Sequence, residues 1–330
     1  MIYNYDKQGL FILVMLWFSI FCLTTNGYAK NSEKEEGIQL ISPYDMKKYD
    51  TDLHLLFNEI SKKPTDINAR IKKASQGLLN KPYLLGALGE GEAGQFDQNP
   101  LYRSDGFDCE TFVDTVLTLA ESKSYQDFPR VLVKIRYFND KPSFLARNHF
   151  TSIDWNSRNQ HNDYVVDVTK RLFPAEYKIS TTVIDKPSWF RHLKASNIKL
   201  LNKPDEKKAK ILLRQLHALG SQAEVKVSQL AYIPLAVLYN KQGEPNQDLF
   251  ARIPDGSVIE IVRPNWNLKD KIGTNLDISH MGIAIRSHGE LLLFEASELK
   301  HKVIPLPLTE YLKNYLKSPT VKGIHIEKIK

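Results

Sequence analysis

The sequence of 330 residues has little cysteine: its only two are Cys22 and Cys109. Cys22 lies in an apolar run near the N-terminus that has the pattern of a cleaved export signal. Exported proteins usually pair their cysteines or have none, and removal of the signal leaves Cys109 alone. An intramolecular disulfide is therefore excluded for the mature chain. A single thiol at the start of an amphipathic segment favours a cysteine nucleophile that acts outside the cytoplasm.

The sequence also lacks a long hydrophobic run. Residues 10–23 are almost wholly apolar, but about 14 residues are fewer than the roughly 20 that a membrane-spanning helix needs. Gly27 and Ala29 are small residues at the two positions that signal peptidase reads. We therefore predict a cleaved signal peptide over residues 1–29, followed by a flexible lead-in over residues 30–45. An uncleaved membrane anchor is the alternative interpretation.

No later stretch is apolar enough to span a membrane, so we expect no stable membrane insertion after cleavage. A lipoprotein signal at Cys22 is disfavoured, because the bulky Phe21 precedes it where such signals have a small residue. Removal of the signal leaves a chain of about 300 residues, which is long enough for one large domain or for two domains.

Positive charge is not concentrated in any segment. The formal net charge is +7, from 45 Lys and Arg against 38 Asp and Glu, and the basic residues are scattered without interleaved aromatics. This distribution argues against nucleic-acid binding. A moderate positive balance suits an acidic partner such as a cell-wall polymer or a lipid head group, and it is equally compatible with no charged partner.

Helical signals come first along the sequence, and strand signals follow. Apolar spacing and caps predict helices from Thr51 or Asp52 to Ile60 (ended by Pro64), Asp66 to about Leu79, Cys109 onward, Asp127 to about Phe138, and Lys207 to Leu219. β-branched and aromatic runs predict strands at Val225–Tyr239 (interrupted by Pro234), Ser257–Val262, His280–Ile285 and Leu291–Ala296. The polar, non-periodic residues 147–163 are predicted to form a loop. This order favours an α+β fold class with an antiparallel sheet.

Cys109 begins an apolar stripe with helical spacing, and Asp108 stands at the N-cap position before it. A thiol is a poor nucleophile until it ionises, and both a helix N-terminus and a nearby imidazolium favour the thiolate. Cys109 at the start of a helix has the first of these two aids. The alternative interpretation is that Cys109 is a buried small apolar residue.

Among the nine histidines, His280 stands at the head of an apolar strand that turns and returns as a second strand. A two-residue turn at residues 288–289 would pair Ser287 with Glu290. Glu295 then lies diagonally beside His280 on the same face, within reach of the imidazole. A base oriented by a third polar group is the general arrangement that activates a nucleophile. The alternatives are an ordinary strand histidine with a solvated Glu295, or a longer loop that changes the register.

Together these segments resemble the NlpC-type cell-wall hydrolases, which are papain-like cysteine enzymes of bacteria. The segments that carry the resemblance occur in the family's order: Lys81-Pro82-Tyr83-Leu84-Leu85-Gly86, Gly106-Phe107-Asp108-Cys109, Pro254-Asp255-Gly256-Ser257-Val258, Ser279-His280-Met281-Gly282-Ile283 and Phe294-Glu295-Ala296-Ser297. The sequence departs from the broad family at Glu110 and Thr111, where Ser-Gly is usual, and at Glu295, where His is common. A carboxylate orients an imidazole at least as well, so we expect an active enzyme.

The Asp-Cys-Glu-Thr-Phe form, the segment from Arg147 to Trp155 and the long span between the motifs resemble a narrower branch. This branch is the N-acetylmuramoyl-L-alanine-amidase-like family, formerly a domain of unknown function. The resemblance implies a helical N-terminal part that places the cysteine at a helix N-terminus, packed on an antiparallel sheet or half-barrel that carries the histidine. It also implies a single catalytic domain over residues 46–330, with an enlarged insertion at about 147–250.

The same resemblance implies cleavage of the amide between muramic acid and L-alanine in soluble anhydro-muropeptides, without a cofactor. Peptidoglycan fragments are the implied partners, and the periplasm is the implied location. The nearest alternative is a D,L-endopeptidase that cuts within the stem peptide. Alternatives of another class are a non-catalytic wall-binding module and a structural protein whose thiol forms an intermolecular disulfide. The sequence carries no signal for the oligomeric state.

Roles are carried over residue by residue. Cys109 is the nucleophile, His280 is the base that becomes the acid for the leaving amine, and Glu295 orients His280. The resemblance places Tyr83 near the oxyanion site, and Asp108 caps the helix and shapes the nucleophile loop. For Tyr83, a half-buried ring at a turn is the alternative.

Further residues are expected to contact the substrate: Arg147, His149, Asp154, Trp155 and Ser279. In this interpretation Trp155 stacks on a sugar face and Arg147 pairs with a peptide carboxylate. The alternative is a polar surface loop packed by its own aromatic residues. His149, Asp154 and His161 are residue types that bind zinc, but their spacings match no compact zinc motif, so we expect no metal.

Overall fold

The structure is a computed structural model, and it describes residues 43–62, 66–202 and 204–330. The predicted signal peptide over residues 1–29 lies outside the described residues, as does most of the predicted lead-in. Residues 43–45 of that lead-in are helical. Within the described ranges, no helix is both long enough and apolar enough to cross a bilayer.

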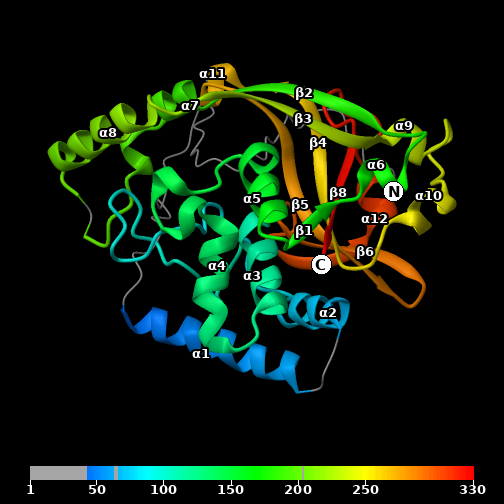
Figure 1. The fold of residues 1–330 in the computed structure, drawn as a ribbon, viewed down its shortest axis with the longest axis horizontal. Coiled ribbons are helices and arrows are strands. Elements are labelled where there is room, and N and C mark those ends of the chain that lie inside the picture. Colours follow the sequence, from blue (N-terminus) through cyan, green and yellow to red (C-terminus); the bar gives the residue numbers. More distant parts are fainter. Residues whose placement is uncertain (1–42, 63–65, 203) are drawn as a thin grey trace, which may run out of the picture.

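Four helices form the N-terminal part: α1 Pro43–Ser61, α2 Ile67–Gly77, α3 Cys109–Glu121 and α4 Phe128–Arg136. They lie together on one side of the strands (Figure 1). The helix expected from Thr51 or Asp52 begins earlier, at Pro43, because proline fits the first helical turn and Tyr49 joins the buried core. Asp66 and Asp127 directly precede α2 and α4, where the sequence placed their starts.

Residues 147–163 do not form the predicted loop. A π-helical turn at Thr151–Trp155 runs directly into α5, Asn156–His161. Polar side chains point inward here: the Asn159 amide donates to the carbonyl of Ile135 at 3.1 Å. Because this helix buries amides instead of apolar groups, its sequence shows no apolar periodicity.

Eight antiparallel strands form the sheet, and this confirms the predicted α+β class. They are β1 Val165–Asp167, β2 Lys178–Asp185, β3 Val225–Pro234, β4 Ser257–Asn267, β5 Asn275–Ser287, β6 Glu290–Ser297, β7 Lys302–Pro307 and β8 Gly323–Ile329. Their order is β2-β3-β8-β4-β5-β6-β7, and β1 also pairs with β8. The strands predicted in the 257–296 region lie within β4, β5 and β6. The strand predicted to reach Tyr239 ends instead at Pro234.

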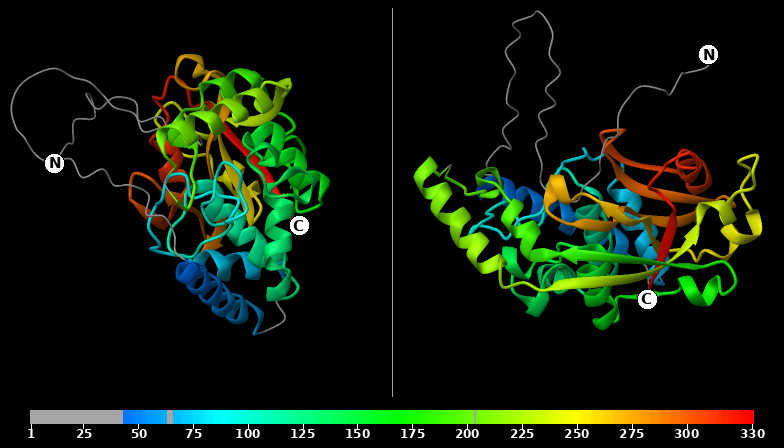
Figure 2. Two further views of the ribbon diagram at one scale, coloured as in Figure 1. Left: turned by 90° about the vertical axis from the view of Figure 1, so that its left-hand side faces the viewer. Right: turned by 90° about the horizontal axis from the view of Figure 1, so that it is seen from above.

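The remaining helices connect or cover these strands: α6 Thr169–Leu172, α7 Lys186–His192, α8 Glu206–Gly220, α9 Leu235–Leu238, α10 Gln247–Arg252, α11 Lys269–Ile272 and α12 Leu308–Lys313. Short 3-10 turns lie at Tyr125–Asp127, Phe138–Asp140, Phe144–Ala146 and Ala195–Asn197. The predicted helix 207–219 is confirmed as α8. Figure 2 shows the long β2–β3 ribbon along one side of the molecule.

The β2–β3 ribbon buries hydroxyls and exposes aliphatic side chains. Ser180 and Thr182 are buried, whereas Val183 is 47% and Val227 is 59% exposed. The main core lies elsewhere. One apolar cluster fills the space between α1–α4 and the sheet, and a second lies between the sheet and α9, α10 and α12. Every residue of α3 except Glu121 is buried, so the helix that begins with Cys109 is the central element of the first cluster.

Candidate active site

Cys109 is the first residue of α3 and is 2% exposed. Asp108 caps this helix, as the sequence predicted: its carboxylate accepts the Thr111 N–H at 2.9 Å, and the Thr111 hydroxyl accepts the Asp108 N–H at 3.0 Å. The second carboxylate oxygen of Asp108 accepts the Ala87 N–H at 3.2 Å. The cap therefore fixes both the thiol and the glycine-rich segment that leads to it.

His280 lies at a bulge in β5. Glu260 of β4 pairs with Met281, but Val262 pairs with Ile278, so two residues of β4 span three of β5. The extra residue lies at Ser279 or His280. Bulges of this kind interrupt the alternation of faces and redirect side chains, and they are frequent beside active sites.

The β5–β6 hairpin has the predicted register. Ser287 pairs with Glu290, and the same register continues to Ile283 opposite Phe294. The imidazole Nε2 of His280 lies 2.5 Å from Oε2 of Glu295, and both side chains are 5% exposed. The diagonal contact between these two residues is thus present in the structure.

The two strands approach closely beside this pair. A Cβ atom added at Gly282 would lie 2.7 Å from the carbonyl oxygen of Phe294 and 2.8 Å from Cδ1 of Leu293. Any larger residue at this position would push β6 away. Gly282 therefore keeps Glu295 within hydrogen-bonding distance of His280.

The second ring nitrogen of His280 is buried and, within the part of the chain that the structure describes, has no hydrogen-bond partner. Helix α3 packs against both β5 and β6. The backbone N–H of Met281, the residue that follows His280, acts to lower the pKa of the Cys109 thiol. The thiol thus lies against the bulged strand, and Cys109 and Glu295 share Tyr83 and Tyr311 as electrostatic neighbours.

The electrostatic surroundings of Cys109 differ from those that the sequence predicted. Burial raises the pKa of Cys109 well above its usual value, and Asp108 and Glu110 raise it further, while the backbone N–H groups of Met281 and Glu110 act in the opposite direction. Burial also raises the pKa of Glu110 well above its usual range, and the charges of Asp114 and Asp108 raise it further. The resting state favoured here is a neutral thiol, not the expected thiolate, because burial outweighs the helix N-terminus.

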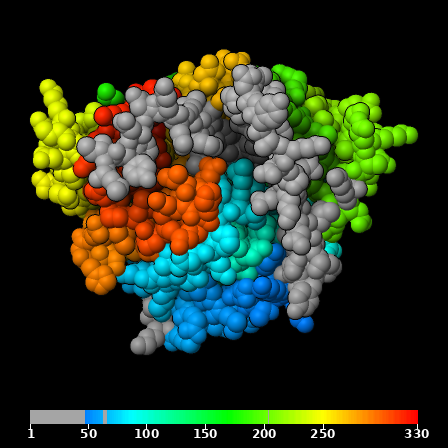
Figure 3. Space-filling view, turned by 180° about the vertical axis from the view of Figure 1, so that it is seen from behind, coloured from blue at the N-terminus to red at the C-terminus, as the bar shows by residue number. Residues whose placement is uncertain are grey.

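Two tyrosines flank the site. The backbone N–H of Tyr83 donates to the His301 carbonyl at 2.9 Å, and Tyr83 pairs with Phe107 on its other side. Figure 3 shows the corresponding contact between the cyan segment and the orange β6–β7 hairpin. Burial raises the pKa of the half-buried Tyr83, and Cys109 and Asp108 raise it further.

Sequence reasoning missed the second tyrosine, Tyr311 of α12. Its ring centroid lies 6.1 Å from that of His280. Burial raises the pKa of Tyr311, followed by the charges of Glu295, Tyr315 and Cys109. The i,i+4 spacing of Tyr311 and Tyr315 was a readable signal, but nothing in the sequence connected Tyr311 to β5 and β6.

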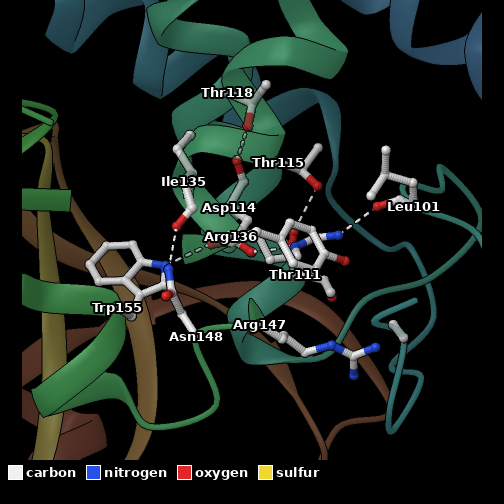
Figure 4. Close-up of polar contacts among 12 residues, drawn as sticks. Leu101, Thr111, Asp114, Thr115, Thr118, Ile135, Arg136, Arg147, Asn148 and Trp155 are labelled. Carbon is white, nitrogen blue, oxygen red and sulfur yellow. Dashed lines mark hydrogen bonds and ion pairs between the residues drawn. The ribbon is translucent and has the colours of Figure 1, made fainter. Parts of the chain in front are cut away.

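A network of buried ions lies behind α3 (Figure 4). The Arg136 guanidinium pairs with Asp114 of α3 at 2.9 Å, and the Trp155 indole N–H donates to the same carboxylate at 2.8 Å. Trp155 is fully buried. The prediction that it stacks on a sugar face is therefore wrong: its ring is a core residue whose N–H satisfies a buried carboxylate.

The prediction for Arg147 is also wrong. Its side chain is 1% exposed and pairs with Glu90 and with Asp97, the latter at 2.9 Å. Both carboxylates belong to the glycine-rich segment before Cys109, so Arg147 holds that segment in place. Because the guanidinium is already occupied, it is not available to a substrate carboxylate.

The other predicted contact residues are placed as follows. His149 packs between Phe144 and Trp189, and a ring nitrogen lies 2.6 Å from the Phe144 carbonyl. Burial lowers the pKa of His149 well below its usual value, so the ring is neutral. Asp154 pairs with Lys186 and lines a pocket of about 420 Å³ whose lining includes none of the Cys109, His280 and Glu295 set. Ser279 lies next to His280, where its hydroxyl accepts the Arg263 Nε–H at 2.9 Å.

Among residues 43–62, 66–202 and 204–330, no group of three or more His, Cys, Asp or Glu side chains is arranged to hold a metal ion. His149 and Asp154 each have other partners.

Comparisons with solved structures place this fold. A crystal structure of a Legionella pneumophila protein, assigned to the family model DUF1460, matches with a TM-score of 0.84 and 39% identity. The match covers 88% of this chain and 97% of that one. A Bacteroides uniformis N-acetylmuramoyl-L-alanine amidase matches with a TM-score of 0.54 and 25% identity, over 80% of this chain and 99% of that one. No curated protein matches the chain.

The fold, the family match and the similarity to a solved amidase together define the class of this protein as an amidase-like cell-wall hydrolase. Within this class, the chain belongs to the N-acetylmuramoyl-L-alanine amidase-like family, AmiA-like, whose model matches residues 73–320. A peptidoglycan-related substrate and a role in the cell wall follow from this membership.

Proposed function

We propose that this protein is a cysteine amidase that cleaves the bond between the muramyl lactyl group and L-alanine in anhydro-muropeptides. Cys109 is the nucleophile, His280 the general base and acid, and Glu295 the group that orients His280. The proposal includes a papain-like, NlpC-type single catalytic domain and export to the periplasm. No cofactor is required.

One observation carries this assignment. His280 is buried at a bulge, its Nε2 is held by Glu295 at 2.5 Å, and its Nδ1 has no partner among the described residues. The backbone N–H of the next residue, Met281, acts on the Cys109 thiol. These observations support a nucleophile, a base and an orienting carboxylate within one buried site.

The first half of the reaction transfers the acyl group to sulfur. As the Cys109 sulfur bonds to the lactyl carbonyl carbon, the thiol proton passes to Nδ1 of His280. This concerted transfer suits a thiol whose pKa is raised. Collapse of the tetrahedral intermediate breaks the C–N bond, and His280 returns the proton to the departing amine of L-alanine. The products of this half are a muramyl thioester and the free peptide.

The second half hydrolyses the thioester. His280 accepts a proton from water as the water oxygen bonds to the acyl carbon. The C–S bond breaks, the proton returns from His280 to sulfur, and the muramyl carboxylic acid leaves and loses its proton to solvent. We assign the oxyanion site to the Tyr83 hydroxyl and the Cys109 backbone N–H. The high pKa of Tyr83 keeps that hydroxyl protonated and able to donate.

The test is incubation of a defined anhydro-disaccharide-tetrapeptide with the wild type and with Cys109→Ser and Cys109→Ala, followed by mass spectrometry. We expect intact disaccharide and intact peptide from the wild type only. A trapped muramyl ester on Cys109→Ser would support acyl transfer.

Other outcomes contradict the assignment. Release of disaccharide that still carries L-alanyl-D-glutamate would mean a D,L-endopeptidase. No cleavage with saturable binding would favour a wall-binding module. Equal cleavage by Cys109→Ala and the wild type would exclude cysteine catalysis.

A further inference from the structure

Arg263 of β4 differs from the other shielded arginines of the described chain. The arginines that are buried or half-buried are Arg70, Arg103, Arg136, Arg147, Arg158, Arg263 and Arg286. Four of them pair with carboxylates: Arg103, Arg136, Arg147 and Arg158. Arg70 and Arg286 each donate to several backbone carbonyl oxygens. Arg263 has neither kind of partner.

The contacts of Arg263 orient its guanidinium without neutralising it. Nε donates to the Ser279 hydroxyl at 2.9 Å, Nη1 donates to the Thr320 hydroxyl, and the group stacks 4.4 Å from the centroid of the Trp266 ring. In the described residues, Nη2 makes no hydrogen bond and no carboxylate lies within ion-pair distance. Partial burial lowers the pKa of Arg263, although the group stays charged at any physiological pH.

Arg263 lies beside the proposed catalytic pair. Its partner Ser279 directly precedes His280 at the bulge. Tyr311, whose ring lies 6.1 Å from that of His280, is also an electrostatic neighbour of Arg263, as is Tyr315. Both tyrosines are in turn electrostatic neighbours of Glu295. The fixed positive charge is therefore part of the same site and not of the ion network behind α3.

The Arg263 guanidinium is fixed in place and has no counter-ion, so it can bind a planar anion. Its parallel N–H groups match the two oxygens of a carboxylate. We propose that Arg263 is a specificity-determining residue that binds a carboxylate of the stem peptide and so holds the leaving peptide beside His280. This inference rests on the proposed function. The carboxylate nearest the scissile amide is the free α-carboxylate of the γ-linked glutamate, and the C-terminal carboxylate is the other source.

The test pairs three substrates with four enzymes. The substrates are an anhydro-muropeptide, its analogue amidated at the glutamate α-carboxylate, and its analogue amidated at the C-terminus. The enzymes are the wild type, Arg263→Gln, Arg263→Lys and the control Arg158→Gln, which alters a half-buried arginine that lines the pocket of Asp154. Cleavage rates give kcat/KM, and thermal unfolding verifies that each variant is folded.

We expect amidation of the glutamate α-carboxylate to lower kcat/KM of the wild type by about 10- to 100-fold, as loss of a charge-assisted hydrogen bond would. Arg263→Gln should show the same loss on the unmodified substrate and no further loss on that analogue. Arg263→Lys should restore part of the preference, and Arg158→Gln should match the wild type. Should C-terminal amidation produce this pattern instead, the partner would be the terminal carboxylate.

Binding distinguishes failure of this inference from failure of the proposed reaction. In the Cys109→Ala background, calorimetry with the same three substrates measures affinity without turnover. Preference for the unmodified substrate that Arg263→Gln removes supports the inference even if the wild type cleaves a different bond. Equal affinity for all three, or an equal loss on all three in Arg263→Gln, overturns it. Ser279→Ala, which releases the guanidinium without removing it, should give a smaller loss of the same preference.

Discussion

Two buried histidines of the same sheet each contact a glutamate through Nε2, and they differ at the other ring nitrogen. In the pair on β8, Nε2 of His325 lies 3.0 Å from Oε1 of Glu327, and Nδ1 of His325 lies 2.7 Å from the carbonyl oxygen of Ala231. A carbonyl oxygen can only accept, so both nitrogens of this ring are donors. In the pair on β5 and β6, Nδ1 of His280 has no partner in the described chain.

The difference separates a structural imidazolium, His325, from the proton carrier that we propose, His280. Burial acts to lower the pKa of His325, but hydrogen bonding to Glu327 and the charges of Glu260 and Glu327 raise it to about 10. Both ring nitrogens of His325 carry a proton that is donated in a hydrogen bond, so the ring cannot accept another proton. A histidine–carboxylate pair therefore gains chemistry from the nitrogen that the fold leaves unused.

Removal of the His280 imidazole, with its unused nitrogen, should have the largest effect on activity. We expect His280→Ala to lower the amidase kcat by about 10³- to 10⁴-fold, because general acid–base catalysis is lost. The unfolding free energy should change much less than in the His325 variant described next. Quenched-time mass spectrometry of muropeptide cleavage and urea unfolding measure the two quantities. Retention of most activity would show that His280 is not the base.

Substitution of the other histidine, His325, should lower stability instead of activity. His325→Gln leaves the buried Glu327 without its cation, so we expect a loss of about 3–5 kcal/mol of unfolding free energy. Urea denaturation monitored by circular dichroism measures it. Below the unfolding transition, kcat per folded molecule should stay near that of the wild type. A selective fall in kcat would break the comparison.

Replacing the glutamate of each histidine pair with glutamine tests the comparison more closely. Glu295→Gln should lower kcat by about 10- to 100-fold, the range typical of groups that orient a functional imidazole. The matched variant Glu327→Gln should lower stability and leave kcat unchanged. Steady-state kinetics on folded protein measures both variants. The interpretation fails if the two variants exchange their effects.

The stability of the folded chain should also depend on pH. The pKa of His325 is higher in the folded than in the unfolded chain, so its contribution is complete below about pH 6.5 and is lost as pH rises toward 10. Burial raises the pKa of Glu260 to about 8, and an acid that is neutral when folded also loses stability as pH rises above about 4.5.

Both groups thus predict lower stability at alkaline pH. We expect the unfolding free energy of the wild type to fall by about 3 kcal/mol or more between pH 6 and pH 9, because each pH unit over which only the folded His325 keeps its proton costs about 1.4 kcal/mol. Urea unfolding at the two pH values measures this fall, and it should be smaller in His325→Gln. An increase in stability over this range would contradict the assignment of a charged His325.

Short-range signals in the sequence predicted the local structure at the head of α3 and in the β5–β6 hairpin. Asp108 was readable as a cap because capping depends on residues three positions apart. The contact between His280 and Glu295 was readable because a two-residue turn fixes the register of a hairpin.

Other features depended on contacts that the sequence does not display. Trp155 and Arg147 were expected to contact substrate, but carboxylates distant in sequence draw them inward: Asp114 for the indole, Glu90 and Asp97 for the guanidinium. Strand β2 escaped detection because it buries hydroxyls and exposes aliphatic groups. The neutral resting thiol depends on burial, which no local pattern shows.

The position of β8 determines when this protein can become an enzyme. It is the last of the described strands in sequence, yet it lies in the middle of the sheet, with β4 on one edge and β1 and β3 on the other. Until residues 323–329 have left the ribosome, β4 lacks its second neighbour and Glu260 lacks His325. Contacts between such distant segments form slowly. The active fold is thus a late event in the life of the chain, and synthesis and activity are separated in time by topology alone.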